Sequence, residues 1–316
     1  MDTSVLSILT NWNLGEVTST ETFSTDKYRC SGNAYFVQCG DSRFVLKRME
    51  RKSALGPLFT VLPELHKQGV PVAEPIATRE GKLAVFRDGD CYYVVPFIYG
   101  SVISDHFGPG MERRSRSFGM ALAKLHAALR KVVLPGSPAD MNLLGQVQAC
   151  EAEAKARGMS RLAIAALDET IEVLGRSAPL PTQLIHRDCH ASNVVFFNDE
   201  VSGWLDFELT MIGPRLFDLC YYSTSLLMDA LCESDRTALW FSVLEYLVSG
   251  YQEVEILTAN ECTLLPYVLL AIEAIFLSYY FSINDRVGAM KNVQALEWIH
   301  RNLAEVQGTI LSHQAG

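Results

Sequence analysis

The segment LIHRDCHASNVVFFNDEVSGWLDFELT, residues 184–210, concentrates carboxylate and amide side chains between apolar runs. Asp188 and Asn193 lie five positions apart in it, ahead of two strand-like runs, VVFF and SGWLDF, which NDEV joins. If these runs pair as a hairpin, Asp206 returns to the loop that holds Asp188 and Asn193. Carboxylate and amide oxygens suit Mg²⁺, which usually keeps waters and is completed by phosphate oxygens. The spacing therefore predicts a site for magnesium and phosphate.

Phosphoryl transfer is the chemistry that such a set of oxygen donors can carry out. Its in-line transition state needs positioning and charge neutralisation more than covalent help. An aspartate such as Asp188 can accept the proton of the attacking hydroxyl, while Asn193 and Asp206 hold a metal ion on the β- and γ-phosphates. The pattern His-Arg-Asp with an asparagine five positions after the aspartate is the one that kinase catalytic loops carry.

Two other interpretations of this segment have less support. A zinc site would use Cys189 and His190, but no second His/Cys pair follows at ligand spacing. A solvated loop between two core strands remains our interpretation only for the turn at residues 198–200. We expect His186 to be a structural histidine rather than a metal ligand.

The N-terminal half gives an independent indication of nucleotide binding. Lys47 stands inside the apolar run RFVLKRM, where a lysine is often only a solvated edge charge. Its context also resembles the strand lysine that pairs with ATP phosphates. Upstream, Ser31 and Gly32 begin a turn between strands whose backbone N–H groups could cover phosphates. This second signal is weak, because it rests on one glycine and not on G-x-G-x-x-G.

Composition and charge narrow the class of protein. The chain has 316 residues and a formal net charge of −9, which argues against sequence-independent binding of nucleic acid. Its eight cysteines form no CxxC pair, as expected for reduced thiols in the cytoplasm, and no N-terminal targeting segment is visible. The apolar stretch 264–281 approaches membrane-spanning length, but Pro266 and Glu273 interrupt it. We therefore expect a buried helix and no membrane partner.

These residues need a scaffold of strands in the first hundred residues and of helices after them. NAYFVQCG and RFVLKRM are predicted as one strand pair, and GKLAVF and CYYVVPFI as a second, with a hairpin turn at Asp88-Gly89. LGPLFTVLPELHKQG, between the pairs, has the apolar spacing of a helix. We predict an α+β fold with two lobes: residues 1–97, β-rich and nucleotide-binding, and residues 98–316, mostly helical, with the catalytic loop.

The chain resembles the aminoglycoside phosphotransferase and choline kinase superfamily, small-molecule kinases with a protein-kinase-like fold. IHRDCHASNVVF, GWLDFE and GPRLFDLCYY carry the resemblance, supported by LAKLHA and VPVAEPI. The family's loop His-x-Asp-x-His-x-x-Asn is matched at every position. The matching residues here are His186, Asp188, His190, Asn193, Asp206, Gly213, Asp218 and Leu219, with His126 in LAKLHA.

The resemblance implies a bilobal protein-kinase-like fold, ATP and Mg²⁺ as cofactors, and a hydroxyl-bearing small molecule as substrate. It also implies a role for each matched residue. Asp188 would be the catalytic base or would orient the acceptor hydroxyl, and Asn193 and Asp206 would ligate Mg²⁺. Lys47 would contact the α- and β-phosphates, and the main chain near Val95 and Phe97 would bind adenine. His186 and Asp218 would brace the loop.

Glu208 and Glu273 are candidate contacts of the acceptor. For Glu273, in an apolar helix, the alternative is a salt bridge or a helix face that reaches solvent, because an unpaired buried carboxylate is costly. We expect a monomer or a homodimer.

Departures from the family pattern leave questions open. Leu58 stands where the family has a small-lobe glutamate, and Glu64 lies too far along the helix, so the ion-pair partner of Lys47 is open. Glu208 replaces a glycine in the loop after the metal aspartate. Arg187 replaces the glycine that small-molecule kinases often carry in His-Gly-Asp.

Three hypotheses follow. The leading one is an ATP- and Mg²⁺-dependent kinase for a small-molecule hydroxyl of the aminoglycoside, amino alcohol, sugar or homoserine type. The second is a protein Ser/Thr kinase, which Arg187 favours. Against it, only twelve positions separate Asp206 from Asp218, and no Ala-Pro-Glu segment is present that could help to dock a peptide. A non-catalytic kinase-like binding protein is third, favoured by Leu58 and opposed by the intact catalytic set.

Overall fold

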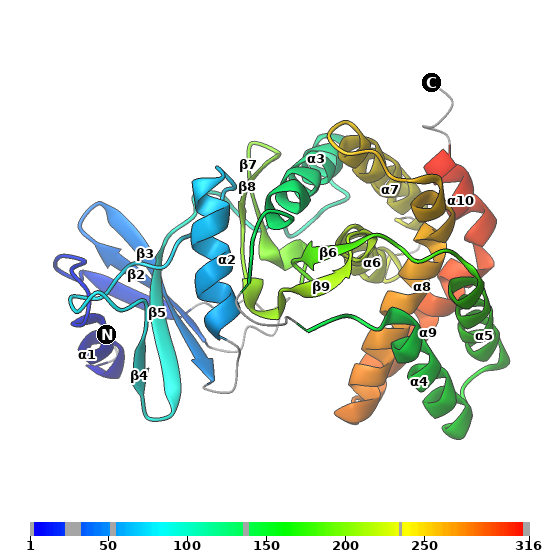
Figure 1. The fold of residues 1–316 in the computed structure, drawn as a ribbon, viewed down its shortest axis with the longest axis horizontal. Helices are drawn as coiled ribbons and strands as arrows, with labels where there is room; N and C mark the ends of the chain where they lie inside the picture. Colours follow the sequence, from blue (N-terminus) through cyan, green and yellow to red (C-terminus); the bar gives the residue numbers. More distant parts are fainter. Residues whose placement is uncertain (1–2, 23–32, 51–54, 135–138, 234–235, 312–316) are drawn as a thin grey trace.

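The computed structural model describes residues 3–22, 33–50, 55–134, 139–233 and 236–311. Figure 1 shows a twisted antiparallel sheet with two helices at one end of the molecule, and a larger, mostly helical part at the other. We call these the sheet lobe and the helical lobe. The arrangement confirms the predicted α+β class with two lobes.

The sheet lobe is built from five strands in the order β1-β2-β3-β5-β4. Its predicted hairpins are present: Gly40 turns between β2 and β3, and Asp88 and Gly89, both with positive φ, turn between β4 and β5. The strand predicted from GKLAVF is short, and the first strand and first helix had no sequence prediction. The elements are α1 (Thr3–Leu9), β1 (Ser19–Thr22), β2 (Ala34–Cys39), β3 (Ser42–Glu50), α2 (Leu55–Lys67), β4 (Val85–Arg87) and β5 (Asp90–Pro96).

Strand alternation divides the sheet lobe between two hydrophobic cores. On one face Leu46 and Val94 pack with Trp12, which follows α1 and donates from Nε1 to the Ile76 carbonyl at 2.8 Å. On the other face, Tyr93 joins the large core that α2 shares with the helical lobe. Lys47 lies opposite Tyr93 in the β3–β5 register, so it lies on the face of the sheet that is turned toward the helical lobe.

The helical lobe is organised around α8, which packs against helices on several sides. At 24 residues, α8 is long and apolar enough to cross a membrane by length and composition alone. Most of it is buried inside the protein, which agrees with the predicted core helix. The helices are α3 (Met111–Leu129), α4 (Leu143–Ala156), α5 (Arg161–Arg176), α6 (Leu216–Ala230), α7 (Thr237–Gln252), α8 (Ala259–Ser282), α9 (Arg286–Arg301) and α10 (Leu303–Leu311).

Two small strand pairs lie between the lobes and carry the loops of interest. The hairpin predicted from VVFF and SGWLDF is present, and a second pair brackets it. A Cβ on Gly100, whose φ is +137°, would lie 2.5 Å from the Phe196 carbonyl oxygen, so only glycine lets the interlobe connection cross the hairpin here. The elements are β6 (Thr182–Ile185), β7 (Val194–Phe197), β8 (Glu200–Trp204), β9 (Met211–Pro214) and the 3₁₀ turns η1 (Ala191–Asn193) and η2 (Phe207–Leu209).

Candidate active site

Asp218 anchors the loop that connects β6 to β7. This residue lies in the first turn of α6 and is completely buried. Its carboxylate accepts hydrogen bonds from the backbone N–H groups of His186 and Arg187, each at 2.8 Å. Arg187 has φ +68°, a conformation that costs a non-glycine residue about 1 kcal/mol. The charge-assisted bonds to Asp218 offset this cost and fix the start of the loop.

His186 ties the catalytic loop to the chain that precedes Asp206. Its Nε2 donates to the Leu205 carbonyl at 2.7 Å, and its Nδ1 accepts from the Asp188 backbone N–H at 3.2 Å. A carbonyl oxygen can only accept, so the ring carries its proton on Nε2. Both ring nitrogens are occupied, which leaves neither for a metal ion. In the described part of the chain, no group of three or more His, Cys, Asp or Glu residues could hold a metal, so the zinc interpretation gains no support.

Asp188 and Asn193 are joined directly. The Asn193 amide Nδ2 donates to the Asp188 carboxylate at 2.8 Å and to the Asp188 carbonyl at 2.9 Å. Asn193 is therefore left with its amide oxygen, the atom a hard metal ion would take. The Leu205 N–H donates to the Asn193 carbonyl at 2.9 Å, which holds Asn193 next to the chain that leads to Asp206.

The environment of Asp188 keeps its carboxylate ionised. Burial raises the pKa of Asp188, but the nearby His190 ring, whose Nε2 lies 3.7 Å from the carboxylate, the His186 ring and the hydrogen bond from Asn193 lower it further, and the net pKa is below the usual range. Tyr221, on α6, points its hydroxyl at the other Asp188 oxygen, 3.4 Å away. A carboxylate with a low pKa is suited to orienting a hydroxyl and is a weak proton acceptor.

Lys47 and Asp206 form an ion pair that connects β3 to the end of the hairpin. Burial favours the neutral lysine, but the charge of Asp206, the hydrogen bond to Asp206 and the charge of Glu208 together raise the pKa of Lys47 above its ordinary value. Lys47 is therefore a partly buried, paired cation and not a solvated edge charge. Asp206 itself has φ +55°, and its side chain is 43% exposed, which leaves room for a ligand.

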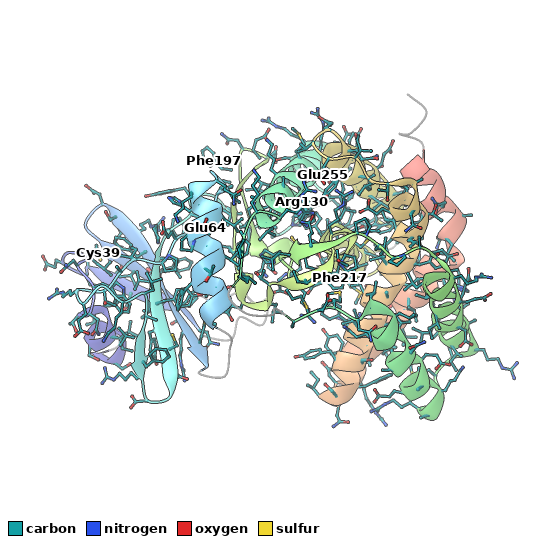
Figure 2. All side chains as sticks on the ribbon, in the orientation of Figure 1. Cys39, Glu64, Arg130, Phe197, Phe217 and Glu255 are labelled. Atoms are coloured by element: carbon teal, nitrogen blue, oxygen red, sulfur yellow. The ribbon has the colours of Figure 1, made fainter. Side chains whose placement is uncertain are left out.

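The small-lobe helix offers Lys47 no carboxylate at the family position. Leu58 occupies that place and is buried in the core. Glu64 lies further along α2 (Figure 2). It pairs with Lys67 at 2.7 Å instead. The turn η2 packs against α2, and its Glu208 is the second carboxylate whose charge raises the pKa of Lys47. Sequence reasoning treated Glu208 only as an acceptor contact and missed this relationship with Lys47.

Burial raises the pKa of Glu208, the positive charge of Lys47 lowers it, and Asp206 and Asp188 raise it, with a net rise. Glu208 is therefore within electrostatic reach of Lys47, Asp206 and Asp188. It lies in the site, where its charge faces the lysine of the sheet lobe.

The residues predicted to bind the nucleotide, other than Lys47, are part of the predicted nucleotide-binding lobe. Val95 pairs with Val45 in the sheet, and the Phe97 N–H donates to the Arg43 carbonyl at 3.0 Å. Ser31 and Gly32 lie outside the described residues.

Glu273 is 2% exposed and accepts from Asn292 Nδ2 at 2.6 Å, between α8 and α9. Burial raises its pKa to about 8, partly offset by the Asn292 hydrogen bond. Glu273 thus reaches neither solvent nor a salt bridge in the described part of the chain.

Together, these loops define a class of protein. A paired lysine on an antiparallel sheet, an aspartate and asparagine on a braced loop, and a second aspartate after a hairpin are arranged as in kinase-like phosphotransferases. The chain belongs to the phosphotransferase enzyme family, whose sequence model matches residues 29–256.

Known proteins with similar sequences and folds are small-molecule kinases. A homoserine kinase of Hyphomonas neptunium is 25% identical over 282 residues, which cover 85% of this chain and 83% of that protein. An amicoumacin kinase in complex with AMP-PNP and Ca²⁺ has a similar fold, with a TM-score of 0.72 at 13% identity over 95% of this chain and 93% of that one. A microcompartment-associated aminopropanol kinase gives a TM-score of 0.69 at 18% identity over 96% and 98%.

These similarities confirm the part of the leading hypothesis that concerns the class of enzyme, a small-molecule kinase. The protein is a small-molecule kinase that uses a nucleotide and phosphorylates a hydroxyl group. The stretch between Asp206 and Asp218 is filled by η2, β9 and the start of α6, which leaves no activation segment for a peptide.

Proposed function

We propose that the protein transfers the γ-phosphoryl group of ATP, with Mg²⁺, to the hydroxyl of a small amino acid of the homoserine type. The observation that carries the phosphoryl-transfer part is the convergence of Lys47, Asp206, Asn193 and Asp188 on one place between the lobes. We also propose that the reaction takes place in the cytoplasm, as the sequence predicts, since a kinase needs ATP there.

The side chains present fit a magnesium ion. Asn193 has its amide oxygen to offer, and Asp206 gives one carboxylate oxygen to Lys47 and has the other left. In this proposal Mg²⁺ neutralises phosphate charge when bound, and Lys47 contacts the α- and β-phosphates. The main chain at Phe97 would face adenine.

Asp188 would orient the acceptor hydroxyl for in-line attack. Its low pKa keeps it ionised, so it accepts a hydrogen bond from that hydroxyl throughout the physiological pH range. The Tyr221 hydroxyl, on α6, donates to the second oxygen of the Asp188 carboxylate. The Tyr221 and Phe276 rings lie 5.0 Å apart and form an aromatic wall there.

Arg187 supports an acceptor that carries a carboxylate. It precedes Asp188 in the chain, its backbone is fixed by Asp218, and its positive charge lowers the pKa of the nearby Tyr221 against the effect of burial. Within the described residues, its guanidinium has no hydrogen bond or ion pair. Arginine binds carboxylates with two parallel hydrogen bonds, and the relatives named homoserine kinase act on an amino acid with such a group.

A matched pair of acceptors tests this proposal. L-homoserine and 3-aminopropan-1-ol have the same amine and hydroxyl, and only homoserine has the carboxylate. We expect ATP- and Mg²⁺-dependent ADP release with homoserine, and a KM for homoserine that rises about 10- to 100-fold in Arg187→Gln, the worth of a charge-assisted hydrogen bond. Turnover of 3-aminopropan-1-ol should be slow and equal in both proteins.

Two results would overturn parts of the proposal separately. Equal turnover of the two acceptors by the wild-type protein would remove the carboxylate from the recognition. Absence of turnover with homoserine, together with strong turnover of an aminoglycoside, would replace the acceptor class and leave the phosphoryl-transfer chemistry in place.

A further inference from the structure

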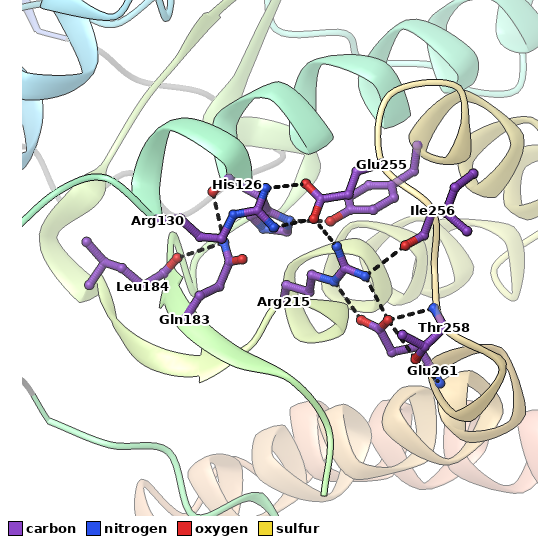
Figure 3. A network of polar contacts seen from close by, with 10 residues as sticks. His126, Arg130, Gln183, Leu184, Arg215, Glu255, Ile256, Thr258 and Glu261 are labelled. Carbon is purple, nitrogen blue, oxygen red and sulfur yellow. Dashed lines mark hydrogen bonds and ion pairs between the residues drawn. The ribbon is translucent and has the colours of Figure 1, made fainter.

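A polar network, buried at Arg215 and Glu261 and reaching the surface at Arg130, joins the ends of α3 and α7 to the starts of α6 and α8 (Figure 3). Its centre is Arg215, at the N-terminus of α6, which donates to both Glu261 oxygens at 2.7 Å and to the Ile256 carbonyl at 3.0 Å. Glu255 pairs with Arg215 on one side and with Arg130 on the other. The network therefore fixes the α7–α8 connection against the helix that carries Asp218.

Tyr251, in the last turn of α7, lies between this network and the catalytic loop. Arg215 lies over its ring, with Cζ 5.8 Å from the ring centre. Its hydroxyl contacts His126 Nδ1, on α3, at 2.9 Å, and His126 Nε2 contacts the Asp218 carboxylate at 3.1 Å. All three side chains are almost fully buried. A continuous chain of hydrogen bonds thus leads from α7 to the residue that anchors the loop.

The close crossing of α3 and α7 brings Tyr251 to His126. A Cβ on Gly119 would lie 2.1 Å from the Leu247 carbonyl oxygen, and a Cβ on Gly250 would lie 2.1 Å from the Arg116 carbonyl oxygen. Only glycine at both positions lets the two backbones touch in this way. His126 lies two helical turns after Gly119, and Tyr251 directly follows Gly250, so the crossing sets the distance between them.

The groups at the two ends, the Tyr251 phenol and the Asp218 carboxylate, determine which atom donates in each hydrogen bond of this chain. Asp218 also accepts two backbone N–H groups, so its carboxylate can only accept from His126 Nε2. Burial raises the pKa of the Tyr251 phenol above its ordinary value, so the hydroxyl keeps its proton. In the described part of the chain, His126 Nδ1 is the hydrogen-bond partner of this hydroxyl, and Tyr251 therefore donates to it. His126 is then a neutral ring with its proton on Nε2.

We propose that Tyr251 is a positioning residue for phosphoryl transfer. Its hydroxyl holds His126 in the tautomer that donates to Asp218, and Asp218 in turn holds the backbone N–H groups of His186 and Arg187 next to Asp188. Without the hydroxyl, the imidazole can place its proton on Nδ1, and Nε2 then turns a lone pair toward the buried carboxylate. The loop loses the fixed anchor on which the alignment of Asp188 depends.

Tyr251→Phe removes only this hydroxyl, and Tyr246→Phe is the matched control. Tyr246 lies on the same helix, but its hydroxyl bonds to Glu112 at the surface. Hydrogen exchange of the His186 and Arg187 amides gives a readout that needs no substrate. The ¹⁵N shifts of the His126 ring report its tautomer. The kcat and KM for ATP, with homoserine or with water as the acceptor, report the effect on the reaction.

We expect Tyr251→Phe to reduce protection of the two amides about fivefold or more, an order of magnitude set by one buried hydrogen bond. The His126 ring signals should change from the Nε2–H form to a mixture, and kcat should fall by a similar factor with KM for ATP unchanged. Tyr246→Phe should match the wild type in all three measurements. An unaltered His126 tautomer, or a loss confined to KM, would overturn the proposal.

A double variant keeps the test independent of overall stability. In His126→Gln, the amide can donate to Asp218 without depending on Tyr251, so adding Tyr251→Phe should cause no further loss of kcat or amide protection. Additive losses in the double variant would show that Tyr251 acts by another route. The amide-protection measurements on the single and double variants need no acceptor. They therefore remain valid even if the acceptor is not homoserine.

Discussion

Lys47 on β3 and Asp206 after β8 form an ion pair that connects the two lobes across 159 positions of sequence. The pair answers the question of the lysine's partner, because Leu58 occupies the glutamate position of the small-lobe helix and is buried. It also places a proposed metal ligand and a proposed phosphate ligand in direct contact. In the proposed function, nucleotide and Mg²⁺ would therefore bind between two groups that already neutralise one another.

Asp206→Asn separates the roles of these two groups. We expect it to abolish the Mg²⁺-dependent part of the stabilisation by ATP, because the amide is a much weaker ligand for a hard cation. Lys47→Met should instead weaken ATP binding both with and without Mg²⁺. Thermal shift measured with ATP, and with ATP and Mg²⁺, distinguishes the two patterns. An undiminished Mg²⁺ response in Asp206→Asn would assign the metal to other residues.

Asp188→Asn tests the group that orients the acceptor. The amide preserves the shape and loses the negative charge, so kcat should fall by about 10²-fold or more. Nucleotide binding should remain close to that of the wild type, because the predicted phosphate and metal ligands are unchanged. The checks are a steady-state ADP-release assay and a thermal-shift titration. Undiminished turnover would show that Asp188 is not the orienting group.

Glu208→Gln tests whether the second carboxylate near Lys47 contributes to the nucleotide site. We expect kcat/KM for ATP to fall about tenfold, because Lys47 would keep only Asp206, which is also the proposed Mg²⁺ ligand. Glu64→Gln is the control, since this exposed residue pairs with Lys67 and should change kcat/KM by less than about twofold. Equal effects of the two substitutions would contradict the prediction.

Glu273 should make stability depend on pH. Its pKa is about 8 in the folded protein, above the ordinary value of 4.5, so the folded state binds the extra proton between these values. The free energy of unfolding should therefore decrease as pH rises from about 4.5 to 8 and level off above. Glu273→Gln removes this contribution and should be more stable than the wild type at pH 8.5. Urea denaturation at pH 6 and pH 8.5 measures the free energy of unfolding of both proteins. An equal change between the two pH values in the wild type and in Glu273→Gln would contradict the prediction.

The sequence alone predicted the features that depend on residues close together in the chain. The hairpin that returns Asp206 toward the loop of Asp188 and Asn193 follows from strand alternation and a turn with left-handed residues at Asn198 and Asp199. Strand alternation and turn residues also predicted the β2–β3 and β4–β5 hairpins. These features involve residues a few positions apart, where backbone geometry leaves few choices.

Only the tertiary structure decided which side chains meet. Lys47 and Asp206, Tyr251 and His126, and Glu273 and Asn292 are each brought together by the packing of elements distant in sequence. The charge of Glu208 and the burial of Glu273 have the same origin, because a residue's exposure depends on what other elements cover it. Spacing along the chain fixes the direction of a side chain on its own helix or strand, but a helix crossing such as the one at Gly119 and Gly250 determines its partner.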